Sequence, residues 1–84
     1  MIFIATFYSH FGAVRFKKNC ESLSIPAVTM PVPRDLSSSC GTCVRFEAEE
    51  LPKYEQHKDE LEKIVEKNDN TYVVLYNSVD ETDD

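Results

Sequence analysis

The chain is short of basic residues and of glycine, and it has no long apolar run. Lys and Arg number nine against fifteen Asp and Glu, giving a formal net charge of −6. This balance argues against a nucleic-acid or anionic-membrane partner, because both bind clustered cations. With two glycines there is no Gly-rich phosphate loop, and neither a Ser-His-Asp order nor paired catalytic carboxylates stand out. A classical hydrolase or kinase is therefore not supported.

Features of export are also missing. No segment approaches the about 18 apolar residues of a membrane span. The apolar start, residues 2–8, lacks a basic flank and a small-residue cleavage site, which argues against a signal peptide. Three cysteines, an odd number, fit poorly with a disulfide-stapled secreted domain. We expect a protein of the reducing cytoplasm.

What is present suits one small domain, residues 1–77, followed by an acidic and disordered tail, residues 78–84. Apolar patterns predict strands over residues 2–8, 27–30, 41–47 and 71–76. Stripes at helical spacing predict helices from Ser9, a candidate N-cap, to Ser22, and from Glu47 to Asn68.

This βαββαβ order predicts an α+β, ferredoxin-like sandwich. It would have a four-stranded antiparallel sheet in the order 4-1-3-2 with both helices on one face. The other face would carry apolar side chains with nothing in the chain to bury them. Such a face marks a partner surface, so we expect a homodimer formed sheet to sheet.

Local chemistry is concentrated between Met30 and Cys43, in the run Met-Pro-Val-Pro-Arg-Asp-Leu-Ser-Ser-Ser-Cys-Gly-Thr-Cys. This run has no apolar period, so packing alone does not explain it. We interpret it as a rigid loop that presents Cys40 just before Gly41. In the expected fold the loop shares one end of the molecule with Ser9 and His10.

A reactive cysteine works as its thiolate, which nearby cations or a helix N-terminus stabilise. The candidates here are the start of the first helix and two side chains, His10 and Arg34. The run Ser37, Ser38 and Ser39 offers hydroxyl and backbone donors. The alternatives are structural: Cys40 as a small residue in a tight turn, Arg34 in a surface ion pair with Asp35, and a solvated His10.

Cys43 completes a C-x-x-C with Cys40, a spacing used in dithiol redox sites and in half of a zinc site. Residues three apart in a strand lie roughly 10 Å apart and point to opposite faces, too far for a disulfide unless Cys40 lies in a turn. Cys43 is then either a resolving thiol or an inert sheet residue. We expect no metal site, since a structural zinc needs four ligands and no second pair is present. We expect no cofactor.

The segment Pro31-Val32-Pro33-Arg34-Asp35-Leu36-Ser37-Ser38-Ser39-Cys40-Gly41 resembles the signature of the selenium/sulfur (Se/S) carrier protein-like family of small bacterial domains. The resemblance extends from Ile2 to about Tyr76. It implies that Cys40 holds a persulfide or selenosulfide for transfer to a partner enzyme. Cys43 and the acidic tail depart from the family pattern.

Three hypotheses follow. The first is a carrier that takes its sulfur or selenium on Cys40 from a cysteine desulfurase or a selenium-pathway protein. The second is a dithiol redox or thiol-sensing module that uses Cys40 and Cys43. The third is an interaction domain without catalysis, which dimerises or docks through its open sheet. A carrier or binding module is favoured over a stand-alone enzyme.

Overall fold

The first half of the chain folds as the sequence predicts. In this computed structural model, which describes residues 1–81, β1 (Ile2–Phe7) leads into α1 (His10–Ser22), and β2 (Ala27–Pro31) is followed by β3 (Thr42–Glu47). The side chain of Ser9 caps α1, since its Oγ accepts the backbone N–H of Gly12 at 3.1 Å. β3 pairs antiparallel with both β1 and β2, so these three strands lie in the order β2-β3-β1.

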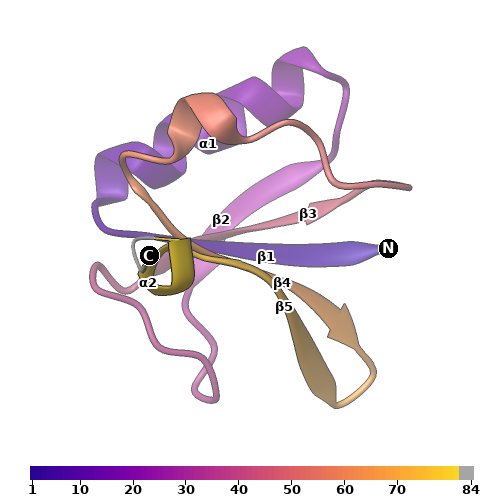
Figure 1. Cartoon of the computed structure of the whole chain (residues 1–84). Helices are drawn as coiled ribbons and strands as arrows, with labels where there is room; N and C mark the ends of the chain where they lie inside the picture. Colours follow the sequence, from indigo (N-terminus) through magenta and orange to yellow (C-terminus); the bar gives the residue numbers. More distant parts are fainter. Residues whose placement is uncertain (82–84) are drawn as a thin grey trace.

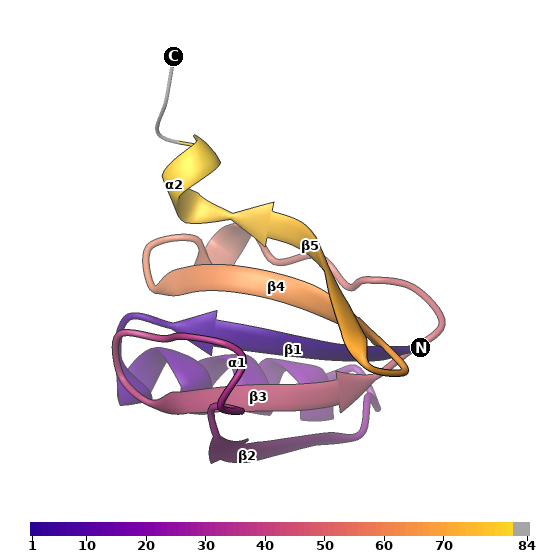
Figure 2. The same ribbon diagram turned by 90° about the horizontal axis from the view of Figure 1, so that it is seen from below.

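The second half does not fold as predicted, and the ferredoxin-like interpretation is wrong. The expected helix over residues 47–68 is instead an extended loop, a short 3-10 helix η1 (Glu55–His57) and a strand β4 (Leu61–Asn68), followed by β5 (Thr71–Asn77). The result is a five-stranded antiparallel sheet, β2-β3-β1-β4-β5, with one long helix (Figures 1 and 2). β4 is inserted between the first and last strands, which the expected fold would have paired directly.

A β-bulge explains why β4 has the apolar spacing of a helix. Ala5 pairs with Ile64 and Phe7 pairs with Leu61, and the register shifts between these two pairs. Glu62 is the extra residue, so Leu61 and Ile64 lie on the same face although they are three positions apart. A spacing of three is a helical signal in sequence, and here it is produced by a strand with an irregular register.

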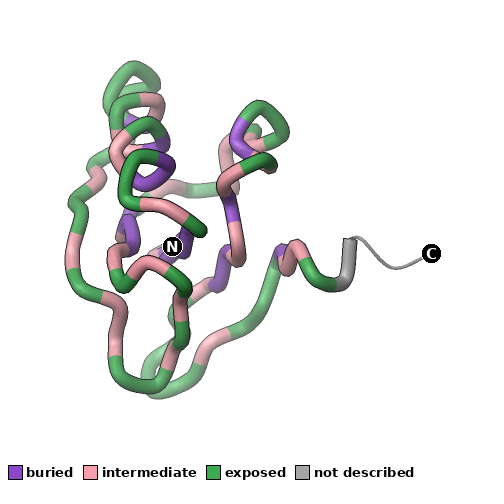
Figure 3. Tube along the Cα trace, turned by 90° about the vertical axis from the view of Figure 1, so that its left-hand side faces the viewer, coloured by how far each residue is buried: buried purple, intermediate pink, exposed green. Residues whose placement is uncertain are grey.

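The main core lies between the sheet and the layer formed by α1 and the η1 segment. Phe16 of α1 is fully buried, and its ring centroid lies 5.3 Å from those of Phe7 and Phe46 and 5.1 Å from that of His57. The η1 segment therefore packs beside α1, where a second helix was expected (Figure 1). Figure 3 marks along the chain which positions are buried, among them positions of α1, of η1 and of the strands. His57 of the η1 segment is only 8% exposed.

The opposite face of the sheet is partly covered by the loop of residues 32–41, which we name the flap. Ile4, Cys43 and Val65 form a small buried cluster there, packed under Val32 and Leu36 of the flap together with Met30 and Tyr72. The flap is visible on the side of the sheet away from α1 in Figures 1 and 2. The expectation of a bare second face is therefore wrong for this part of the sheet. Dimerisation through this face is untested.

The first residues of the C-terminal segment are folded. The residues Ser78–Glu81, which we expected to open a disordered tail, form a short helix α2, and residues 82–84 lie outside the described part of the chain. Within residues 1–81, no helix has the length and apolar character needed to cross a membrane.

Candidate functional site

The predicted site residues gather at one end of the sheet, where β1 ends, α1 begins and the flap enters β3. Ser38 Oγ donates to the carbonyl oxygen of Phe7 at 3.3 Å, which ties the flap to the end of β1. His10 Nδ1 lies 3.3 Å from Thr42 Oγ1, which ties the first turn of α1 to the start of β3. The topology therefore places His10 and the flap at the same end of the sheet.

Cys40 lies in the turn that leads into β3. Gly41 has a φ of +78°, which reverses the chain and brings the backbone of Thr42 back toward the cysteine. The N–H of Thr42 donates to Cys40 Sγ at 3.4 Å, and the same sulfur lies 3.4 Å from the carbonyl oxygen of Thr42. An N–H aimed at sulfur is a favourable contact for a thiolate, whereas the carbonyl can accept only from the protonated thiol. The sulfur therefore has a contact for each protonation state.

Exposure separates Cys40 from the other two cysteines. Cys20 and Cys43 are fully buried, whereas Cys40 is half-buried and packs its inner side against the core under α1. Burial raises the pKa of Cys20 to about 11, with a smaller contribution from Glu21. Burial raises the pKa of Cys43 to about 11 as well, with a smaller contribution from the nearby Cys40. Of the three thiols, Cys40 is the one that a reactant can approach.

The two cysteines of the C-x-x-C pack against different parts of the core. All three cysteines are free. Cys43 Sγ lies 3.7 Å from the carbonyl oxygen of Pro31 and belongs to the cluster under the flap, whereas Cys40 packs against the cluster on the α1 side. The two side chains therefore pack on opposite faces of the sheet.

The serine run anchors the flap to a carboxylate that sequence analysis did not single out. Glu62 accepts the backbone N–H of Ser39 at 3.1 Å and its hydroxyl at 3.4 Å. Glu62 is the extra residue of the β4 bulge, and bulges commonly redirect a side chain in this way. No signal in the sequence identifies this role, because the pattern of these residues predicted a helix in place of β4.

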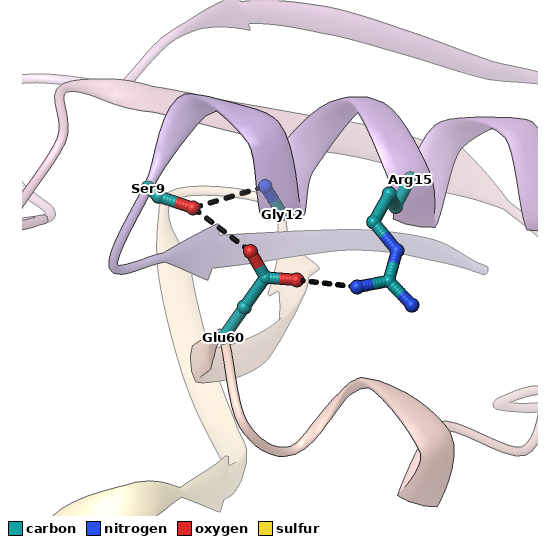
Figure 4. Close-up of polar contacts among 4 residues, drawn as sticks. All are labelled: Ser9, Gly12, Arg15 and Glu60. Carbon is teal, nitrogen blue, oxygen red and sulfur yellow. Dashed lines mark hydrogen bonds and ion pairs between the residues drawn. The ribbon is translucent and has the colours of Figure 1, made fainter.

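A second carboxylate, Glu60, fastens α1 to the start of β4 (Figure 4). It accepts from Ser9 Oγ and from Arg15, each at 3.0 Å. The backbone of α1 approaches so closely here that a Cβ on Gly12 would lie 2.7 Å from the Cβ of Glu60. A glycine normally lowers the stability of a helix. Gly12 is nevertheless required here, because a larger residue would collide with Glu60.

Arg34 and Ser37 are exposed, and neither has a hydrogen bond or ion pair within residues 1–81. Arg34 therefore makes no hydrogen bond to Cys40 in this structure. His10 contacts Thr42, whose backbone N–H donates to Cys40 Sγ. His10 therefore lies near the cysteine but has no hydrogen bond of its own to the sulfur.

A depression on the surface of the domain lies apart from the candidate site. A shallow depression of about 470 Å³ is lined by residues 47–53 with Ser24 and Ile25, and it lies where β3 ends, away from Cys40. Among the described residues no cluster of three or more His, Cys, Asp or Glu is suited to a metal ion.

Comparison with known proteins adds a family and no individual relative. Neither the curated proteins nor the solved structures gave a match. A family model matches residues 3–77, which span all five strands and α1 and include the flap and Cys40. The chain therefore belongs to the family described as Putative Se/S carrier protein-like.

Proposed function

We propose that the protein carries sulfur or selenium on Cys40, as a persulfide or selenosulfide, between a donor enzyme and an acceptor. The observation that carries this proposal is the contrast among the three thiols: Cys40 is accessible and accepts the N–H of Thr42, whereas Cys20 and Cys43 are buried. Membership of the family supports the chemical class of the cargo.

The proposed loading step is a transpersulfidation. The Cys40 thiolate attacks the terminal sulfur of a protein persulfide, such as that of a cysteine desulfurase. The sulfur–sulfur bond of the donor breaks, its cysteine leaves as a thiolate, and a new bond joins the transferred sulfur to Cys40 Sγ. The electron count balances without an external oxidant, since one persulfide is formed as another is consumed. Delivery is the reverse exchange, with a nucleophile of the acceptor attacking the terminal atom.

The surroundings of Cys40 support this exchange in two ways. The N–H of Thr42 is fixed in β3 and can stabilise the anionic sulfur when Cys40 is the leaving group during delivery. Ser39 and Glu62 hold the preceding residues of the flap against β4, which keeps the cysteine in a defined place.

Intact-mass analysis after incubation with a cysteine desulfurase and cysteine tests the proposal. We expect a gain of one sulfur atom on the wild-type chain and on Cys43→Ala, and none on Cys40→Ser. The Cys43→Ala variant is the matched control, because it removes the other half of the C-x-x-C without touching the accessible thiol. A sulfur adduct on Cys40→Ser would refute Cys40 as the carrier, as would a persulfide donor that leaves every variant unchanged while loading a known acceptor.

A dithiol function for Cys40 and Cys43 is disfavoured by the same geometry, since their side chains pack on opposite faces of the sheet. The mass experiment separates this hypothesis as well. A wild-type chain that loses two hydrogens on oxidation and yields a Cys40–Cys43 peptide pair would favour the redox module over the carrier.

A further inference from the structure

The two edges of the sheet are built differently. β2 forms one edge, and prolines stand before it, at its end and shortly after it: Pro26, Pro31 and Pro33. Proline cannot donate to a strand ladder, and edge prolines are a common protection against unwanted strand pairing. The β2 edge is therefore protected against pairing with a further strand.

The β5 edge lacks this protection. From Thr71 to Val79 the chain has no proline, no glycine and no charged residue. Three consecutive side chains of β5 are exposed: Val73 (45%), Val74 (53%) and Leu75 (42%). Within residues 1–81 no strand pairs with β5 on its outer side, so this edge also offers unpaired backbone groups. Its one irregularity is a register shift against β4 at Leu75.

We propose that β5 pairs antiparallel with β5 of a second copy of this chain, joining two sheets edge to edge. The sequence of the strand supports a second copy as the partner, because Tyr72-Val73-Val74-Leu75-Tyr76 is nearly the same in both directions. About a two-fold axis at Val74, the valine meets its own equivalent and Val73 meets Leu75. Self-complementarity of this kind is what an isologous interface requires.

The distribution of charge also favours a second copy of this chain as the partner. Two copies with a net charge of −6 each repel one another wherever acidic surfaces meet. The uncharged run of β5 gives a line of contact that avoids this repulsion. The nearest charged neighbours on β4, Glu66 and Lys67, have opposite signs and lie one strand further from the axis.

This pairing leaves both Cys40 sites free. The end of β5 lies at the Cys40 end of the sheet, since Asn77 pairs with Lys63 and the hydroxyls of Tyr8 and Ser78 are hydrogen-bonded. Antiparallel pairing of two β5 strands therefore directs the two Cys40 sites to opposite ends of the joined sheet. The inference does not depend on the carrier function, and each site keeps its own approach.

Sedimentation velocity of the full chain in reducing buffer, between about 5 and 500 µM, tests the proposal. Val74→Lys places a charge at the proposed axis. The matched control is Val28→Lys, because Val28 is similarly exposed (50%, against 53% for Val74) and lies on the protected β2 edge. The registers place Val28, Arg45, Ile4, Val65 and Val74 in one row across the sheet, so the two valines occupy its two ends on the same face.

We expect the wild type and Val28→Lys to dimerise with rising concentration, and Val74→Lys to require at least a tenfold higher concentration. Circular dichroism of each variant checks that the fold is retained. A wild type that stays monomeric throughout overturns the proposal. So does a dimer that Val74→Lys leaves intact, or one that both substitutions weaken equally.

Cross-linking fixes the geometry. In a Cys40→Ser background, Val74→Cys should form a covalent dimer on oxidation because the residue faces its own equivalent across the axis. Val28→Cys in the same background should remain monomeric. The reverse pattern would contradict pairing through β5.

Discussion

The two faces of the sheet are covered in different ways. The cover on one face stabilises the fold, whereas the cover on the other face controls how accessible Cys43 is. On one face α1 and the η1 segment bury four phenylalanines, Phe3, Phe7, Phe16 and Phe46, in a continuous core. On the other face the flap covers a cluster of three buried residues and is held by a few polar contacts at its ends and tip. A small domain of this kind needs one well-packed face for its stability, which leaves the second cover thin enough to position a reactive residue.

Removing an aromatic ring from the α1 face should have the largest effect. Phe16→Ala deletes the ring that contacts Phe7, Phe46 and His57. We expect the free energy of unfolding to fall by about 3–5 kcal/mol, because the cavity cannot close between two rigid layers. Urea denaturation followed by circular dichroism measures this. A loss below about 1 kcal/mol would mean that the face is far less tightly packed than the structure indicates.

A smaller effect on the same face is expected from a substitution at Gly12. The change in stability should have the opposite sign to the one that helix propensity alone predicts. Gly12→Ala should stabilise a free helix by about 1 kcal/mol. In this fold the new Cβ would meet the Cβ of Glu60 at 2.7 Å, so we expect a net loss of about 1–3 kcal/mol.

The control for this measurement is Lys18→Ala, an exposed position of the same helix where no such contact exists. Urea midpoints of the two variants against the wild type decide the matter. A more stable Gly12→Ala chain would show that α1 can move away from β4 without cost.

The flap face should respond mainly in accessibility. Leu36→Ala removes a partly buried contact with the cluster that contains Cys43, and we expect a loss of only about 1 kcal/mol. The larger consequence is opening of the flap, which should raise the rate of alkylation of Cys43 by iodoacetamide at least tenfold.

Peptide mapping by mass spectrometry reads the alkylation of each cysteine separately. Cys20 serves as the internal control, since it is buried on the α1 face and its pKa is also raised to about 11. An equal rise at Cys20 and Cys43 would indicate global unfolding and would remove the distinction between the two covers.

The smallest expected effect is a pH dependence on the α1 face. Burial, and then the positive charge of Arg15, lower the pKa of His57 below its ordinary value of 6.5, while Glu60 acts in the opposite direction. As the pH falls below about 6.5, the unfolded chain binds a proton that the folded chain resists, so the free energy of unfolding should fall. The slope cannot exceed about 1.4 kcal/mol per pH unit for one group.

Urea denaturation between about pH 5 and pH 7.5 measures this slope. It should shrink in His57→Phe, which keeps an aromatic ring against Phe16, and persist in His10→Gln, the exposed histidine. A slope that is unchanged in His57→Phe would assign the pH dependence to other groups.

Sequence patterns predicted the first half of the chain because its signals are local. Ser9 as the cap of α1, the loop before β3 and the position of His10 at the same end of the sheet as this loop follow from short-range chemistry and one topological rule. β4 was missed because the bulge at Glu62 gives it a helical spacing, and a bulge is specified by pairing with β1 rather than by the residues of β4 themselves.

The candidate site was predicted in part for the same reason. Cys40 and its serines are marked by composition, so the sequence could single them out. Their partners, Glu62 and the backbone of Thr42, come from another strand and from the path of the main chain, neither of which has a sequence signal. The burial of Cys43 depends on the flap folding back over the sheet, which a local pattern cannot show.

The central place of β1 also sets the order in which the domain can fold. Both partners of β1 come later in the chain, one of them in residues 61–68. Its apolar side chains remain unpaired until most of the chain has been made, and such long-range pairings are slow to form and prone to aggregate meanwhile. We therefore expect the domain to fold only after residues 61–68 have been synthesised, and slow synthesis of its last third should prolong the exposure of β1.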